Sequence, residues 1–298
     1  MDTIWILNKF ECKSQEETKK EERKITNTQM ESYHQYLIRE EKSTATVEKY
    51  LRDARAFVVY VGDGIITKEV VMAYKKELQI KEYAVRSINS MLASLNSLLK
   101  FLGWSDCKVK AIKQQKQVYC AEEKELSKAE YMRLLEAAKS KPQLQLVMQT
   151  ICGTGICVSE LKFFTVEDVK QGEVLVNCKG KTRTILIPGK LRKLLLDYAK
   201  KEKIRSGVIF LTRNGKPLNR SCIWAQMKAL CEEAGVNPSK VFPHNLRKLF
   251  ARTFYGIEKD IAKLADILGH SSIDTTRIYI MTTGTEHRRK IERLGLVV

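Results

Sequence analysis

The chain has 298 residues, 44% of them hydrophobic, which predicts two globular domains rather than low-complexity disorder. Its formal net charge of +18 exceeds what solubility requires and predicts a polyanionic partner, with nucleic acid favoured over a membrane surface. Residues 179–220 carry about +11 of that charge, and the absence of any apolar run near the roughly 18 residues of a bilayer span argues against a transmembrane role.

The N-terminal part of the chain predicts an extension followed by a small helical domain. Residues 1–26 mix acidic and basic side chains without sustained periodicity, and we interpret them as a short arm. From residue 27 to about 112 the apolar residues follow a helical period. The pattern predicts helices near 28–40, 44–61, 68–81 and 85–102, with Ser43 or Thr44 capping the second and glycines ending the second and fourth.

The fourth of these helices carries a polar face opposite its leucine stripe. Beside Arg86, this face consists of small side chains, namely Ser87, Asn89, Ser90, Ser94 and Ser97. Such a face could lie in a DNA groove, or it could simply be exposed to solvent. The residue pattern leaves both interpretations open.

The second half of the chain predicts a mixed domain. Residues 113–125 are polar and aperiodic and predict a linker, and Ser127 with Glu130 fits a capping box that opens the next helix. Helices are expected near 128–139 and 143–153, followed by strands near 163–168, 173–178 and 183–188. Further helices are expected near 190–202, 221–234, 244–256, 259–268, 274–280 and 284–293, so the fold class is mainly α with a small antiparallel β-sheet.

Two segments in this second domain combine rare histidines with possible partners. In "FPHNLRKLF", a helix that begins at Pro243 would place His244 and Arg247 on one face. In "LGHSSIDTTRIY", His270 and Tyr279 stand nine residues apart near a helix end. A lone histidine is more often structural and a lone tyrosine more often part of a core, so each residue also has a plainer interpretation.

Lys179, in the tight basic turn of "CKGKTR", adds a third kind of polar group. Taken alone it resembles a surface lysine. Together, a lysine, an arginine, two histidines and a tyrosine suit phosphoryl transfer in which side chains replace a metal ion. A phenol titrates near pH 10, so it attacks usefully only where cations and a base support it.

The cysteines predict neither a metal site nor a disulfide framework. The eight of them form no CxxC or Cys/His ligand spacing and lie at residues 12, 107, 120, 152, 157, 178, 222 and 231. No segment resembles a signal peptide, so we expect reduced thiols and a cytoplasmic protein. We expect no metal ion and no cofactor.

Four motifs give the sequence a specific resemblance. "TGICVSEL" (154–161), "CKGKTR" (178–183), "HNLR" (244–247) and "LGHSSIDTTRIY" (268–279) occur in the order and approximate spacing of the tyrosine recombinase, or phage integrase, family. The resemblance is to its Xer-like and mobile-element integrase branch and covers nearly the whole chain. It implies a four-helix core-binding (SAM-like) domain at 27–112 and a tyrosine-recombinase catalytic domain at 126–298, which ends in an oligomerisation segment.

The resemblance also implies roles for individual residues. Tyr279 would attack a DNA phosphodiester, forming a 3′-phosphotyrosyl link and a free 5′-hydroxyl. Lys179 would be the general acid to the 5′ oxygen, and His244 would assist proton transfer or hold the phosphate. Arg247 would clamp the non-bridging oxygens, and His270 would hydrogen-bond the same phosphate.

The chain departs from the family pattern at Cys157, where the family has the first arginine of the phosphate clamp. Our main interpretation is a damaged clamp; the alternatives are rescue by an arginine from another segment, or a small structural residue in a site that works differently. Lys162 is expected to point elsewhere. Glu160 would orient the arginine in the family, so its partner is expected to be absent and the local charge more negative. Lys248, where many members have histidine, is a minor departure.

Three functions compete on this evidence. The first is a site-specific DNA recombinase or integrase of a mobile element, impaired by Cys157, that works on double-stranded DNA as a homo-tetramer. Its final residues "KIERLGLVV" would dock on a neighbouring subunit or fold back onto their own chain. The second is a cleavage-deficient DNA-binding protein of the same fold, and the third a type IB topoisomerase. A cytoplasmic, nucleoid-associated location is expected.

Overall fold

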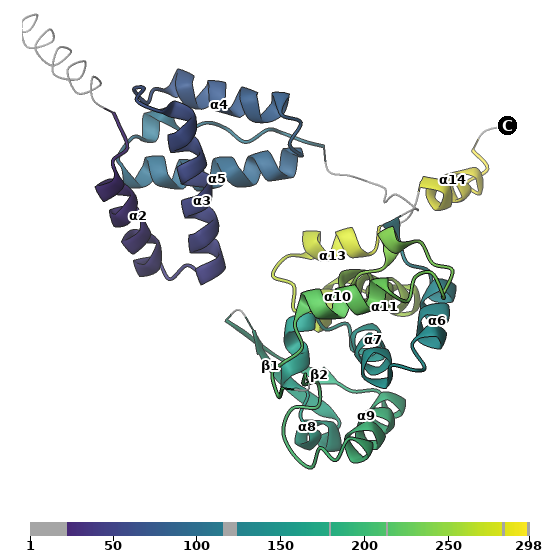
Figure 1. Cartoon of the computed structure of the whole chain (residues 1–298). Helices are drawn as coiled ribbons and strands as arrows, with labels where there is room; N and C mark the ends of the chain where they lie inside the picture. The colour runs from purple at the N-terminus through teal and green to yellow at the C-terminus, as the bar shows by residue number, and fades with distance from the viewer. Residues whose placement is uncertain (1–22, 116–123, 179, 213, 282–283, 297–298) are drawn as a thin grey trace, which may run out of the picture. The chain divides into compact units, whose positions relative to one another are not determined.

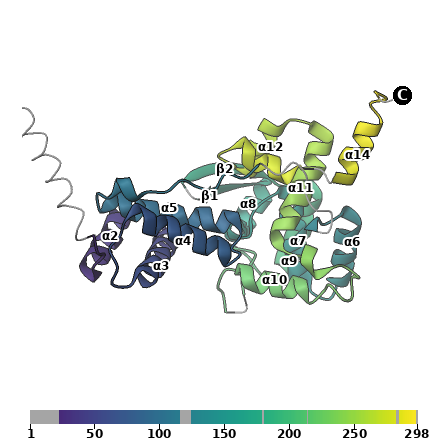
Figure 2. The ribbon, with the colours of Figure 1, turned by 90° about the horizontal axis from the view of Figure 1, so that it is seen from above.

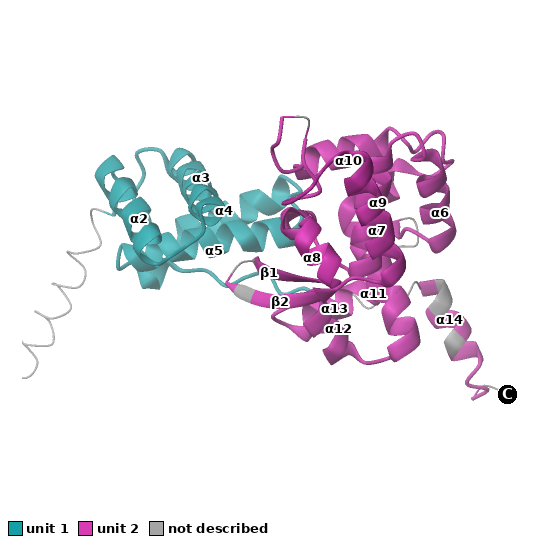
Figure 3. Cartoon of the chain, turned by 90° about the horizontal axis from the view of Figure 1, so that it is seen from below, with its two compact units in different colours: residues 1–116 teal, residues 117–298 magenta. Residues whose placement is uncertain are grey.

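The computed structural model describes residues 23–115, 124–178, 180–212, 214–281 and 284–296. The chain divides into two compact units, residues 1–116 and 117–298 (Figure 3). Helices dominate both units, and the described strands form one two-stranded antiparallel sheet. The mainly helical fold with a small antiparallel sheet is therefore confirmed.

The described part of the first unit contains four α-helices (Figure 1): α2 (Asn27–Arg39), α3 (Thr44–Val61), α4 (Lys68–Ile80) and α5 (Val85–Phe101), followed by the short 3₁₀ helix η1 (Ser105–Cys107). The apolar stripe of α5 is buried against the other helices, with Leu92, Leu95 and Leu99 at most 1% exposed. α3 ends at Val61 and is capped by Gly62, whose φ of +58° suits glycine. The helical period of the sequence thus predicted the four α-helices of this bundle but not the 3₁₀ helix η1.

The polar face of α5 is partly buried and partly exposed. Ser94 is fully buried, donates to Asp53 (2.9 Å) and accepts from the ammonium of Lys49 (2.9 Å). Asn89 exchanges two hydrogen bonds with the backbone of Ile112 (2.7 and 3.0 Å). Much of this face therefore holds the unit together, because buried polar groups need partners; Ser87 and Ser90 are the members that stay exposed.

The second unit combines the two-stranded sheet with helices. It comprises α6 (Lys128–Ala137), α7 (Pro142–Thr154), η3 (Val158–Phe163), α8 (Val166–Gln171), β1 (Glu173–Cys178), β2 (Lys181–Leu186), α9 (Gly189–Lys201), α10 (Arg220–Lys228), η4 (Pro238–Lys240), α11 (Pro243–Glu258), α12 (Ile261–Leu268), α13 (Ile273–Tyr279) and α14 (Gly284–Glu292). The predicted capping box opens α6, with Ser127 and Glu130 bonding each other's backbone amides. No described helix is long and apolar enough to cross a membrane.

One predicted strand was wrong. Residues 163–168 end the 3₁₀ helix η3 and begin α8, because the Thr165 hydroxyl accepts the backbone N–H of Asp168 and caps that helix. Within this segment, Thr165 forms a single isolated bridge, to Val208. The other two strands do pair, with Cys178 opposite Lys181.

Two packed helices form the base of the candidate site. α7 and α11 lie side by side in Figure 2 and contribute buried residues such as Val147, Met148 and Leu246 to the main core. Tyr279 is 8% exposed and belongs to a second cluster with Ala251, Leu264 and Leu268. The end of α13 is thereby anchored against α11 and α12.

Candidate active site

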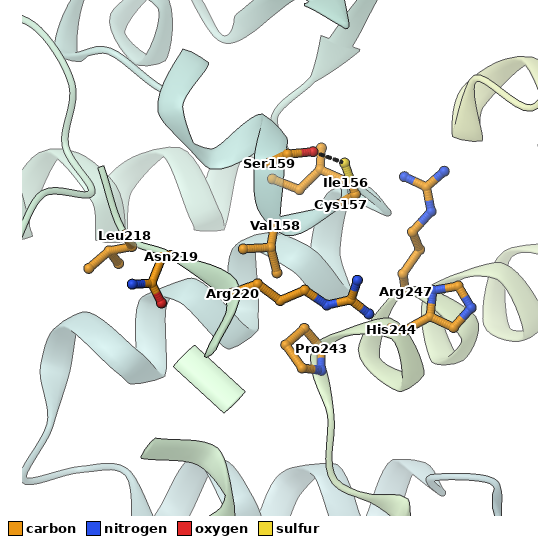
Figure 4. A pocket seen from close by; sticks show the side chains of 10 residues that line it. All are labelled: Ile156, Cys157, Val158, Ser159, Leu218, Asn219, Arg220, Pro243, His244 and Arg247. Carbon is orange, nitrogen blue, oxygen red and sulfur yellow. Dashed lines mark hydrogen bonds between the residues drawn. The ribbon is translucent and has the colours of Figure 1, made fainter. Parts of the chain in front are cut away.

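Helix α11 provides the cationic centre of the site. It begins at Pro243, as the sequence predicted, and presents His244 and Arg247 to the same cavity (Figure 4). The Arg247 side chain is 9% exposed, and its Nη2 donates to the carbonyl oxygen of Leu268 (2.6 Å). Its Nη1 is buried without a hydrogen-bond partner among the described residues. A buried unpaired guanidinium donor suits an incoming anion.

His270 lies between α12 and α13, where Gly269 adopts a left-handed φ of +69°. Its Nε2 faces Nη2 of Arg247 at 3.2 Å, and its Nδ1 lies 2.9 Å from the hydroxyl of Thr276. Because an arginine can only donate, Nε2 accepts and Nδ1 carries the proton. Burial, followed by the charges of Arg247 and Arg183, lowers the pKa of His270 to about 4.

Tyr279 ends α13 between the two histidines. Its ring centroid lies 5.0 Å from that of His244 and 4.8 Å from that of His270. Its hydroxyl lies 3.5 Å from Nδ1 of His244. Burial raises the pKa of Tyr279 against the opposing effect of Arg247. Burial, then the charges of Lys248 and Arg247, lowers the pKa of His244.

Cys157 lies at the N-terminus of η3, on the wall of the cavity. The cavity has a volume of about 400 Å³ and is lined by residues that include Cys157, Ser159, Arg220, His244 and Arg247. The Cys157 Sγ lies 2.9 Å from the Ser159 hydroxyl, the contact dashed in Figure 4. Burial raises the pKa of Cys157, so the thiol is uncharged at neutral pH and offers only a weak donor.

Glu160 has a cationic partner that we did not expect. Both of its carboxylate oxygens accept from Nη2 of Arg183 at 2.9 Å, and Oε2 lies 3.6 Å from Nη1 of Arg247. Oε2 also accepts the backbone N–H of Cys157 (2.7 Å). The expected surplus of negative charge was therefore wrong, because β2 places Arg183 opposite the carboxylate. Sequence reasoning overlooked Arg183 although it ends the quoted motif "CKGKTR".

Of the two lysines Lys162 and Lys179, the structure describes Lys162. Lys179 lies outside the described residues, next to Gly180, which adopts a left-handed φ of +71°. Lys162 points away, as expected, with its ammonium 5.0 Å above the ring of Phe163. Arg220, at the start of α10, extends toward His244 in Figure 4.

The arrangement brings four of the six predicted site residues into one contact cluster: Tyr279, His244, Arg247 and His270. Cys157 lines the same cavity as His244 and Arg247. These groups can bind an anion and move a proton beside a phenol. Among the described residues, no group of three or more His, Cys, Asp or Glu side chains could hold a metal ion.

Comparison with known families identifies the family of the chain. Residues 124–285 match the phage integrase family, and residues 30–106 match the N-terminal SAM-like domain of phage integrases. The chain belongs to the phage integrase family. It is thus a member of the tyrosine recombinases, enzymes that cleave and transfer DNA strands, and its match to both domains confirms the predicted fold.

Individual members of this family are similar to this chain along most of its length. The tyrosine recombinase XerA of Pyrococcus furiosus is 28% identical over 285 residues, covering 93% of this chain and 97% of the relative. A lambda integrase dimer bound to a COC′ core site has a similar fold, with a TM-score of 0.70 at 20% identity over 87% of this chain and 96% of that one. The Tn1549 transposon integrase, in complex with transposon right end DNA, has a TM-score of 0.66 at 16% identity, covering 89% and 99%.

Proposed function

We propose that this recombinase is a site-specific integrase of a mobile element that transfers DNA strands through a covalent phosphotyrosine. The Tyr279 oxygen attacks the phosphorus of a phosphodiester, and a bond between this oxygen and phosphorus forms. The bond between phosphorus and the 5′ oxygen breaks, so that the 3′ end of the cut strand is linked to Tyr279 through the phosphate. The phenolic proton leaves to a base, and the 5′ oxygen receives a proton from an acid. The covalent link conserves the bond for rejoining, so the step balances without ATP or a metal ion.

The observation that carries this proposal is the contact of Tyr279 with His244 beside Arg247. A phenol 3.5 Å from an imidazole nitrogen has an acceptor for its proton. The unpaired Nη1 of Arg247 supplies a donor for a non-bridging phosphate oxygen. We assign Tyr279 as nucleophile, His244 as proton acceptor and Arg247 as phosphate clamp.

Two further residues complete the proposed chemistry. His270 would hold the same phosphate, because its imidazole already lies against Arg247 at 3.2 Å. Lys179 would be the acid for the 5′ oxygen, an assignment that rests on the sequence motif alone. The basic run at 179–220 would bind the phosphate backbone without regard to sequence.

Cys157 makes this recombinase a weakened catalyst in our proposal. Loss of an arginine that stabilises transition-state charge in phosphoryl transfer lowers rates on the order of 10³-fold or more. The Cys157 thiol is neutral and lies in hydrogen-bond contact with the hydroxyl of Ser159, so it cannot provide a positive charge. DNA binding depends on many contacts, so we expect the protein to bind DNA despite the cysteine at position 157.

For assembly, we propose a homo-tetramer on two DNA duplexes held together by the C-terminal segment. Exposed apolar side chains support this proposal: Ile291 at 53%, Leu294 at 61% and Leu296 at 82%. Residues 27–112 would clasp the DNA as a core-binding domain, with residues 113–125 as the linker to the catalytic domain at 126–298. The lambda integrase structure, a dimer on its core site, is an example from the same fold.

A nicked suicide substrate tests the proposal against its two alternatives. The DNA site is first selected from a random-sequence library by binding to the protein. A covalent complex in the parent protein that is absent in Tyr279→Phe supports strand transfer, whereas equal gel shifts without any covalent complex identify a DNA-binding protein. Relaxation of supercoiled plasmid without exchange of partners would instead indicate a topoisomerase.

A further inference from the structure

Arg183 occupies a position in the site that no assigned role explains. Its side chain is 14% exposed and bridges two parts of the second unit. Nη2 donates to both carboxylate oxygens of Glu160, and Nη1 donates to the carbonyl oxygen of Ile267. The stem of Arg183 passes over Gly269 so closely that a Cβ there would lie 2.8 Å from Nε. The left-handed glycine beside His270 therefore also makes room for this arginine.

The charges around Glu160 show what this contact does. One buried carboxylate faces two guanidinium groups, so one positive charge remains for a ligand. Arg183 holds both oxygens at 2.9 Å, whereas Nη1 of Arg247 stays at 3.6 Å, beyond ordinary hydrogen-bond distance. Without Arg183, Glu160 and Arg247 would neutralise each other, and the free donor of Arg247 would be lost.

We propose that Arg183 is a positioning residue that neutralises Glu160 in place of the missing arginine at position 157, and so keeps Arg247 free to bind the scissile phosphate. This role rests on the proposed function only for the identity of the phosphate. In this role Arg183 acts on the phosphate only through Glu160 and Arg247. The family pattern places an arginine near Glu160 at residue 157; here β2 delivers one from residue 183.

Titration of the full chain with inorganic phosphate tests the inference without requiring cleavage. Binding is followed by the NMR signals of the His270 and His244 imidazoles. We expect Arg183→Gln to weaken phosphate binding by about tenfold, the order of one lost charge interaction in a partly buried site. Arg183→Lys keeps the charge but loses the bond of Nη1 to the carbonyl oxygen of Ile267, so its phosphate affinity is expected to fall between those of the parent and Arg183→Gln.

The deciding variant is Glu160→Gln in the Arg183→Gln background. Removing the unpaired carboxylate charge should free Arg247 again and restore phosphate affinity to within about threefold of the parent. Cys157→Arg in the same background should restore it as well, since an arginine at 157 gives Glu160 a partner. Arg252→Gln is the matched control, because Arg252 also joins a carboxylate, that of Glu125, to a backbone carbonyl, that of Leu126.

Each result decides the matter. Weakening by Arg183→Gln with recovery by Glu160→Gln, while Arg252→Gln stays within about twofold of the parent, supports the role. Parent-like binding in Arg183→Gln, weakening without recovery, or no phosphate response at the parent histidines overturns it. Phosphate binding without any covalent DNA complex would count against the proposed function and leave the role of Arg183 standing.

Discussion

The hydroxyl of Tyr279 lies 3.5 Å from Nδ1 of His244, although the two residues are 35 positions apart in the chain. Burial raises the pKa of the phenol and lowers the pKa of the imidazole. At neutral pH a protonated phenol therefore faces a neutral imidazole that can accept its proton. Attack by Tyr279 on phosphorus would be accompanied by this proton transfer rather than preceded by ionisation.

Restoring the clamp arginine should accelerate cleavage. Cys157→Arg places a guanidinium on the wall of the cavity shared with His244 and Arg247. We expect the rate of covalent complex formation to rise by about tenfold or more, since loss of such an arginine elsewhere costs about 10³-fold. Single-turnover kinetics on the suicide substrate measure it. Cys157→Ser is the control and should stay near the parent rate; equal rates in all three proteins would contradict the damaged-clamp interpretation.

The folded protein should lose stability as the pH falls from about 6.5 toward 4. Burial and two arginines lower the pKa of His270 to about 4, whereas an unfolded histidine titrates near pH 6.5. Between these values the unfolded state binds more protons, so acid favours unfolding. Thermal unfolding across this pH range should show a shallower decline in His270→Asn than in the parent. His34→Asn, in the other unit, serves as control, and an unchanged slope in His270→Asn would count against this linkage.

The turn that leads to Cys157 should tolerate only glycine at residue 155. Gly155 has a φ of +68°, and a Cβ there would lie 2.4 Å from the ring of Phe250. Gly155→Ala should lower the unfolding free energy by about 2–4 kcal/mol through backbone strain and overpacking. Gly153→Ala is the matched control: its Cβ would meet Leu191 at an ordinary 3.5 Å, and helix propensity predicts up to about 1 kcal/mol of stabilisation. Chemical denaturation compares the two, and similar effects would refute the prediction.

The polar face of α5 offers a second matched pair. Ser94→Ala removes a buried hydroxyl bonded to both Asp53 and Lys49 and should destabilise the first unit by about 1–3 kcal/mol. The Ser90 side chain is exposed, so Ser90→Ala should stay within about 0.5 kcal/mol of the parent. Hydrogen exchange of the α5 amides reports on this unit directly. Equal protection in both variants would mean that Ser94 contributes no net stability.

Local sequence patterns predicted most of the fold because helices and their caps depend on residues that are close together in the chain. The stripe of α5 and the capping box at Ser127 are read from residues three or four apart, and both are present. The strand expected at 163–168 failed because two adjacent phenylalanines resemble a strand, while the cap at Thr165 decides in favour of a helix.

In the candidate site, too, contacts between residues close in sequence could be predicted and contacts between distant residues could not. His244 and Arg247 share one helix turn, and His270 and Tyr279 belong to one motif, so their proximity within each pair could be predicted. Arg183 could not be assigned, because its role depends on Glu160 and Ile267, 23 and 84 residues away. Contacts of that range carry no periodic signal, and only the fold reveals them.

Identification of the residue bonded to DNA tests the central claim most directly. The parent and Cys157→Arg proteins are incubated with the nicked substrate, digested with protease, and analysed by mass spectrometry for a peptide that carries a nucleotide. We predict one modified peptide containing Tyr279, linked to a 3′-phosphate, and none from Tyr279→Phe. A 5′-linked adduct, an adduct on another residue, or the same adduct from Tyr279→Phe would contradict the assignment of Tyr279 as the nucleophile.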